Sequence, residues 1–273
     1  MNIKRMICLA VCAGLMLVPF CGCSNNDAEL ETQDTIVSAA ESSQETSRVT
    51  ETEITTENTS ETTAFNEVVE LDPQLQSYAN TFITNFVEQS FPDYDRETAG
   101  VEKMLDFVHI FLKINDSDSI SYVNNGDLTF ETFSIESVQV VTVKYLGLII
   151  SDEDYSGLPV PPETYGDQPA GPFFEDGMIW YEAADGESRN NIGIVDAINN
   201  PGDGTLNMEF TVYAIDLDIY LSLSADDIRA YYDLTPEQAQ SDDTLQAVAE
   251  GTATVGVAQS GDYYLIDYST SWN

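Results

Sequence analysis

Two segments beyond residue 70 carry apolar residues at helical spacing. The first follows Asp72 and Pro73, which suit the N-cap and first position of a helix, and it stops before Pro92. Its apolar positions recur every three or four residues: Leu75, Tyr78, Ala79, Phe82, Ile83, Phe86 and Val87. The second segment has the same spacing in Val101, Met104, Leu105, Val108, Phe111 and Leu112. The sequence therefore predicts two amphipathic helices.

The segment 134–149 fits two structures. Ile135, Val138 and Val141 lie at helical spacing, whereas the β-branched run 140–143 favours a strand. We expect a helix that ends at Gly147, with a strand as the alternative.

Beyond a proline-containing loop at 156–177, the pattern changes to alternation of apolar and polar residues. Such alternation, broken by turns rich in Gly, Asn and Pro, indicates strands. We expect strands at 178–184, 192–198, 206–215, 248–258 and 263–272, and short helices at 224–232 and 236–240. Helices followed by mostly antiparallel strands are typical of an α+β domain with helices packed on one face of a curved sheet.

This order of elements is similar to that of NTF2-like and cystatin-like folds. The resemblance implies a curved sheet that wraps helices around a cone-shaped cavity. The phrases at 75–89, 106–115 and 263–268 also resemble an uncharacterised family of lipoproteins from clostridial-type bacteria. That resemblance spans most of residues 70–273 and implies origin and architecture, but no activity.

The N-terminus has the pattern of a secretory signal. Lys4 and Arg5 precede the apolar segment 6–20, which is short for a membrane span. The segment ends in Gly22-Cys23 and resembles the lipobox of bacterial lipoproteins, although Phe20 replaces the usual aliphatic residue. The resemblance implies cleavage after Gly22, a lipid on Cys23, and a membrane partner at the outer face of the bacterial cell membrane. An ordinary cleaved signal without lipid is the alternative.

The stretch after Cys23 is rich in Ser, Thr and Glu and has little apolar periodicity. Such a composition buries too little apolar surface to offset chain entropy. We therefore expect three regions: a signal peptide at 1–22, a disordered tether at 23–66, and a single globular α+β domain at 67–273.

Composition narrows the range of functions. The net charge of −39 makes nucleic acid an unfavourable partner, because phosphates would be repelled. All four cysteines precede residue 24, so the expected domain has neither disulfides nor thiol chemistry. His109, the single histidine, fits a helix-edge residue better than a catalytic base. The common hydrolase, zinc-protease and nucleotide-binding motifs do not occur in the sequence.

Calcium is the one cofactor that the sequence suggests. Asp152, Glu153 and Asp154 form an acidic run that supplies hard oxygen ligands. The segments 115–118 and 226–227 are further candidates, but 115–118 lacks the Gly and distal Glu of a calcium loop, and acids at 226–227 also suit a helix N-terminus.

Aromatic pairs suggest a binding surface. Phe173 and Phe174 leave the loop, and Trp180 and Tyr181 open the next strand. Because side chains alternate along a strand, we expect one member of each pair to be buried and the other to point outward. Outward rings would stack on a sugar or grip an extended peptide.

We therefore expect a lipid-anchored, extracytoplasmic, non-enzymatic module that binds an unidentified protein, peptide or glycan. A carboxylate-based glycan hydrolase is the first alternative, because acidic pairs are abundant. A calcium-stabilised structural module is the second.

The anchor is directly testable. Replacing Cys23 by Ala should abolish labelling by fatty acid and release the chain from the membrane fraction, because thioether lipidation requires the thiol. Fractionation and labelling of both proteins in a bacterial host measure this. A Cys21→Ala variant is the control, and it should stay anchored. A Cys23→Ala chain that remains labelled would contradict the assignment.

Overall fold

The computed structural model describes residues 67–164, 171–184 and 190–272. The expected signal peptide at 1–22, the tether at 23–66 and Cys23 lie outside these residues. No helix in these described ranges is both long enough and apolar enough to cross a membrane.

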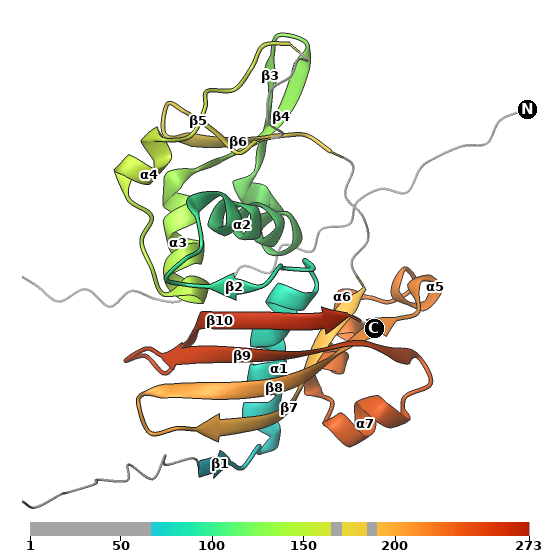
Figure 1. The fold of residues 1–273 in the computed structure, drawn as a ribbon. Coiled ribbons are helices and arrows are strands. Elements are labelled where there is room, and N and C mark those ends of the chain that lie inside the picture. The colour runs from blue at the N-terminus through green and yellow to red at the C-terminus, as the bar shows by residue number, and fades with distance from the viewer. Residues whose placement is uncertain (1–66, 165–170, 185–189, 273) are drawn as a thin grey trace, which may run out of the picture. The chain divides into compact units, whose positions relative to one another are not determined.

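A six-stranded antiparallel sheet forms the base of the fold (Figure 1). Its order is β1-β7-β8-β9-β10-β2, and its four long strands form a meander. The strands are β1 (Glu67–Val69), β2 (Tyr94–Asp95), β7 (Asn191–Asn200), β8 (Thr205–Ile215), β9 (Leu245–Val257) and β10 (Tyr263–Trp272). The strands expected at 192–198, 206–215, 248–258 and 263–272 are all members of this sheet, and each prediction is confirmed.

A smaller antiparallel sheet has the order β3-β4-β6-β5. Its strands are β3 (Ser121–Asn125), β4 (Leu128–Ser134), β5 (Phe173–Glu175) and β6 (Met178–Glu182). The sequence predicted only β6. The sequence analysis predicts no structure for the segment that forms β3 and β4. The strand β5 lies within the segment 156–177, for which a loop was expected.

Three longer helices and several short ones complete the fold. The long helices are α1 (Pro73–Val87), α2 (Val101–Asn115) and α3 (Ile135–Leu146). The short ones are α4 (Asp152–Ser156), α5 (Leu217–Tyr220), α6 (Ala225–Ala230), α7 (Pro236–Ser241) and the 3-10 turns η1 (Ser117–Ser119) and η2 (Tyr231–Asp233). The α+β class predicted from the sequence is therefore confirmed.

Local signals set the boundaries of these helices. The Asp72 side chain accepts a hydrogen bond from the Leu75 amide at 2.8 Å, and Pro73 takes the first helical position, as expected. Gly147 ends α3 in the left-handed conformation, with φ of 62°. The ambiguous segment is thus a helix, because its buried positions Val138, Val141 and Leu146 follow helical spacing.

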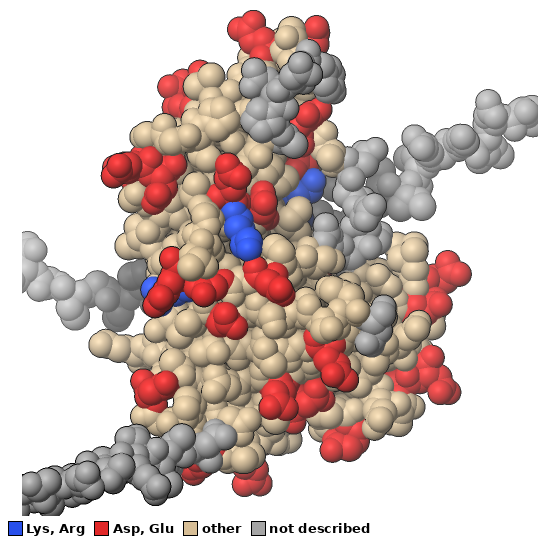
Figure 2. Space-filling model, viewed as in Figure 1, with Lys and Arg blue, Asp and Glu red and all other residues tan. Residues whose placement is uncertain are grey.

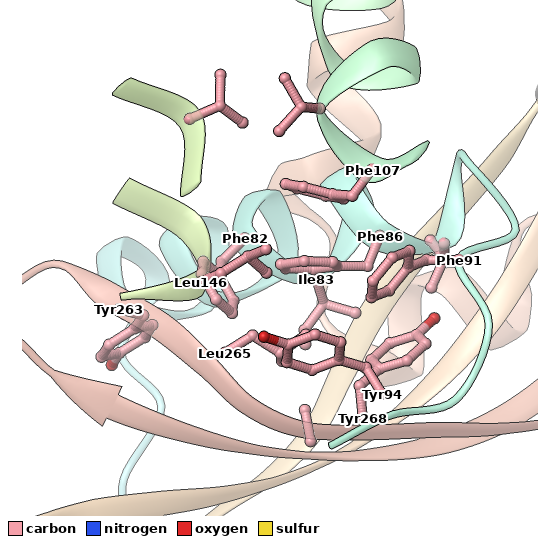
Figure 3. Packing of buried hydrophobic residues seen from close by; sticks show 14 of the residues in the cluster. Phe82, Ile83, Phe86, Phe91, Tyr94, Phe107, Leu146, Tyr263, Leu265 and Tyr268 are labelled. Atoms are coloured by element: carbon pink, nitrogen blue, oxygen red, sulfur yellow. The ribbon is translucent and has the colours of Figure 1, made fainter. Parts of the chain in front are cut away.

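The space between the helices and the large sheet is packed with aromatic side chains (Figure 3). Phe86 of α1 stacks on Phe107 of α2, with ring centroids 4.9 Å apart. Tyr268 of β10 stacks on Phe210 of β8 at 5.6 Å. The cone-shaped cavity implied by the NTF2-like and cystatin-like resemblance is therefore not confirmed, because packed rings occupy the space where it was expected.

A polar stripe on α1 satisfies backbone groups of β7. One edge of β7 pairs with β8. On its other edge, the described part of β1 pairs only with residues 198–200. Next to this pairing, the Val195 amide donates to Asn80 Oδ1 at 2.8 Å, and the Gly193 amide donates to Thr84 Oγ1 at 3.0 Å. The Gln76 side-chain amide donates to the Val195 carbonyl at 2.8 Å. Side chains four residues apart on one helix face thus replace a missing strand.

The same stripe fixes the chain that follows α6. The Asn80 side-chain amide donates to the carbonyl oxygens of Tyr232 and Leu234, both at 2.9 Å. Asn80 has no exposed surface, so its hydrogen bonds hold α1, β7 and η2 together inside the protein.

Replacing Asn80 by Ala should lower the free energy of unfolding by at least about 3 kcal/mol. The change leaves a buried N–H and two carbonyl oxygens without this partner, and each such group costs about 1–3 kcal/mol. Urea denaturation measures the change. Thr81→Ala on the adjacent exposed position is the control and should cost less than about 1 kcal/mol. Equal losses in both variants would contradict the role assigned to Asn80.

Candidate functional site

The four predicted aromatic residues lie in the smaller sheet and are divided between its two faces. Phe173 and Trp180 are cross-strand partners and pack with Phe130 and Leu128 in one small cluster. Phe174 and Tyr181 belong to the opposite face, where Phe174 stacks on a tyrosine of α4, Tyr155, at 5.6 Å.

One member of each pair is buried, as expected, but the other packs in a hydrophobic cluster instead of pointing outward. Phe173 and Tyr181 are buried, whereas Phe174 and Trp180 are half-buried. The two less buried rings lie on opposite faces, so they do not form one shared platform. Ligand binding by these residues stays a prediction.

The acidic run Asp152, Glu153 and Asp154 forms the first turn of α4. The Asp154 carboxylate accepts hydrogen bonds from the Ser151 amide at 3.2 Å and from the Ser151 hydroxyl at 2.6 Å, in a capping box. This local role explains one of the three acids. No group of three or more His, Cys, Asp or Glu side chains within the described ranges is arranged to hold a metal ion. Calcium binding stays a prediction.

His109 takes part in a buried polar network between α2 and the smaller sheet. Glu131 of β4 is 1% exposed, and its carboxylate meets His109 Nε2 at 2.6 Å and Lys113 Nζ at 2.8 Å. The Tyr122 hydroxyl donates to the same carboxylate at 3.1 Å. The His109 ring stacks on Tyr181 with centroids 4.1 Å apart.

The charges of this network follow from its surroundings. Burial lowers the pKa of His109 despite its contact with Glu131. Burial would raise the pKa of Glu131, but hydrogen bonds from Lys113 and His109 outweigh it and lower that pKa. A neutral His109 that donates to an ionised Glu131 fits both directions. The network joins α2 to β4, with Glu131 and His109 buried and Tyr122 exposed at its edge.

An open polar pocket lies between α1, the end of α2 and the α6–η2 segment. Its volume is about 420 Å³. Nearly every lining side chain can form hydrogen bonds: Ser77, Thr81, Thr84, Asn85, Glu88, Asn115, Arg229, Tyr232 and Asp233. A volume of this order suits a small organic ligand. We regard this pocket, here called the Glu88 pocket, as the candidate functional site.

Glu88 gives the pocket its chemical character. The residue caps the C-terminal end of α1 and is 9% exposed. Burial raises the pKa of its carboxyl group from 4.5 to about 7, and a hydrogen bond with Asn115 opposes the rise only in part. Glu88 takes part in none of the ion pairs found among the described residues. A buried acid of this kind changes charge near neutral pH.

Charge around the pocket is mainly negative. Arg229 lies at the rim, largely exposed, and its guanidinium meets Asp226 at 3.4 Å. Asp233, another acid of the lining, accepts a hydrogen bond from the Ser77 hydroxyl at 2.5 Å. Figure 2, viewed with the large sheet in front of α1, shows a similar excess of acidic over basic side chains elsewhere on the surface. The surroundings therefore favour a neutral or cationic ligand over an anionic one.

Sequence reasoning did not find Glu88. It occupies a position beside the apolar stripe of α1, where an acid is ordinary, and nothing in the local pattern shows that the α6–η2 segment covers it. The run of polar residues Ser77, Thr81, Thr84, Asn85 and Glu88 on the same helix was the available signal. That signal alone does not distinguish a solvated helix face from a pocket wall.

Glu88→Gln should remove a pH dependence of stability. The pKa of about 7 in the folded protein lies above the ordinary 4.5. The stability that protonated Glu88 contributes is therefore complete below pH 4.5 and is lost as pH rises through 7. Relative to wild type, the variant should gain about 3 kcal/mol in unfolding free energy between pH 4.5 and pH 8.

Chemical denaturation at several pH values measures this difference, and the comparison removes the opposite contribution of His109, which is common to both proteins. Glu153→Gln, an exposed acid in α4, is the matched control and should follow wild type. A constant difference between wild type and Glu88→Gln would show that the Glu88 carboxyl group titrates normally.

Comparison with known proteins adds no relative from which a function could be transferred. No protein-family model, curated protein sequence or solved structure matches this chain. The assignment of a site therefore depends on the geometry of the described residues alone.

Proposed function

We propose that this chain is a lipid-anchored, extracytoplasmic binding protein of the bacterial cell surface. Cys23 carries the lipid, residues 23–66 form the tether, and the α+β domain holds a small polar ligand in the Glu88 pocket without transforming it. The N-terminal sequence supports the anchor, and the pocket supports the binding role.

The observation that carries the proposal is the lining of the Glu88 pocket. Its walls include the hydroxyl groups of Ser77 and Thr81, the side-chain amides of Asn85 and Asn115, and one buried carboxyl group. These hydroxyl and amide groups donate hydrogen bonds within the protein. The wall therefore offers mainly acceptor oxygens to a hydroxylated molecule. Rigid elements hold it, because Asn80 bonds α1 to η2 directly behind the pocket.

A binding role accounts for the lining better than catalysis does. Hydrolysis by carboxylates needs two acids on opposite sides of a scissile bond. Of the acids in the pocket, Asp233 is already engaged by Ser77, and Glu88 remains for the ligand. A hydroxyl group acts as a nucleophile only when a general base accepts its proton, so the Ser, Thr and Asn side chains of this pocket suit ligand binding.

A carboxylate-based glycan hydrolase is the second candidate, and a groove of about 400 Å³ on the outer face of the large sheet favours it. Asp196, Glu209 and Glu250 line this groove. Partial burial of the carboxyl group and the nearby acids raise the pKa of Asp196, although the residue as a whole is exposed. Release of reducing sugar from glycans by wild type, lost in Asp196→Asn, would favour this candidate.

Filling the Glu88 pocket should abolish ligand binding. In NMR titrations of the purified full-length chain with hydroxylated small molecules, neutral and cationic, the amide signals of Asn85 and Asn115 should shift. Thr81→Trp should weaken the affinity at least about tenfold, because the indole occupies the pocket. Gln74→Trp, at an exposed position earlier in α1, is the control and should bind like wild type. Shifts that centre on the outer sheet face, or that survive Thr81→Trp, would contradict the site.

A further inference from the structure

We infer that the natural ligand of the Glu88 pocket is a hydroxylated primary amine, whose ammonium group pairs with the Glu88 carboxylate. The inference rests on the proposed function, since it names the chemical class of the ligand at the same site. An amino sugar or an amino alcohol of similar size has the required groups.

In the free protein, Glu88 lies in the wall of the pocket. The carboxyl group is buried, and hydrogen bonding to Asn115 supports its ionised form only in part. Ionising a buried carboxyl group is unfavourable unless a cation compensates. The pocket has an opening to solvent, so a ligand can supply that cation.

Among the described residues, the groups that neighbour Glu88 do not supply this cation. On α6, Arg229 pairs with the exposed Asp226, and it does not contribute to the electrostatics of Glu88. On η2, Asp233 is negative and Tyr232 is neutral, since burial, Glu88 and Tyr220 together raise the pKa of Tyr232 to about 12. On α5, burial and Glu88 raise the pKa of Tyr220. From α2, Asn115 is uncharged.

Tyr232 suits an ammonium group. It lines the same pocket as Glu88, and an uncharged tyrosine beside a carboxylate is a favourable neighbour for a cation. An anionic ligand would meet Glu88 and Asp233 with like charge. A neutral ligand would leave the Glu88 carboxylate without compensation.

The remaining wall of the pocket offers acceptor oxygens. Thr81 Oγ1 and Asn85 Nδ2 donate to the carbonyl oxygens of Ser77 and Thr81, both at 2.8 Å. Thr81 Oγ1 and the Asn85 side-chain oxygen therefore remain as acceptors for the hydroxyl groups of a ligand. A volume of about 420 Å³ accommodates a molecule the size of a hexose derivative. A simple alkylamine would donate hydrogen bonds from its ammonium group alone, whereas an amine that carries hydroxyl groups also donates to these wall oxygens.

A matched pair of probes tests the inference. Glucamine and glucitol share one carbon skeleton and differ by an amine in place of one hydroxyl group. Calorimetric titration of the purified full-length chain at pH 8 should give at least about tenfold tighter binding of glucamine. At pH 6 the binding of glucamine should be about tenfold weaker than at pH 8, because Glu88 becomes protonated while the amine stays charged. Binding of glucitol should not change with pH.

Variants separate the pocket from general charge attraction. Glu88→Gln should reduce the glucamine affinity to that of glucitol and remove its pH dependence. Glu153→Gln deletes one acid elsewhere and should leave both affinities within about twofold of wild type. Retained glucamine binding in Glu88→Gln would overturn the inference.

The outcomes also separate the inference from the proposed function. Equal affinities for both probes, lost in Thr81→Trp, would overturn the amine class and leave the Glu88 pocket as a binding site for neutral polyols. Failure of both probes to bind at millimolar concentration would contradict the amine and polyol classes alike, and the broader titration would then decide whether the pocket binds ligands at all.

Discussion

The fold depends on the hydrogen bonds between α1 and the uncovered side of β7. Buried backbone groups need partners, and β1 is too short to supply them along the whole strand. Asn80 and Thr84 take the place of the missing strand. The approach is close, because a Cβ atom at Gly193 would lie 2.5 Å from the Ile83 side chain. A glycine at this position lets the helix reach the strand.

This arrangement makes α1 the link between the core and the Glu88 pocket. Its apolar stripe packs into the aromatic cluster, whereas its polar residues bind β7, bind the chain after α6, and line the pocket. Asn80 therefore serves stability and site geometry together. Any change that loosens α1 from β7 would also move the pocket wall, so binding and folding are coupled through one helix.

Two buried acids show how surroundings decide the behaviour of the same side chain. Glu131 has Lys113 and His109 as partners, and its pKa is lowered. Among the described residues, Glu88 has Asn115 as its hydrogen-bond partner and no basic one, and its pKa is raised to about 7. The first acid is satisfied within the protein and joins two elements. The second acid is buried without a compensating positive charge among the described residues. Acids with a pKa raised in this way are common at functional sites.

The sequence by itself determined the α+β class, the first two long helices and the four long strands, because periodicity and capping act over neighbouring residues. It left the segment 134–149 open between a helix and a strand, and the structure makes it the helix α3. It also indicated the alternation that buries Phe173 and Tyr181. It did not reveal β3 and β4, whose short alternating segments are stabilised by pairing with β6. Nor did it distinguish Glu88 from the other acids of the chain. Only the tertiary structure decided that, since the burial of Glu88 depends on contacts with Asn115 of α2 and with the α6–η2 segment, which no local pattern in α1 predicts.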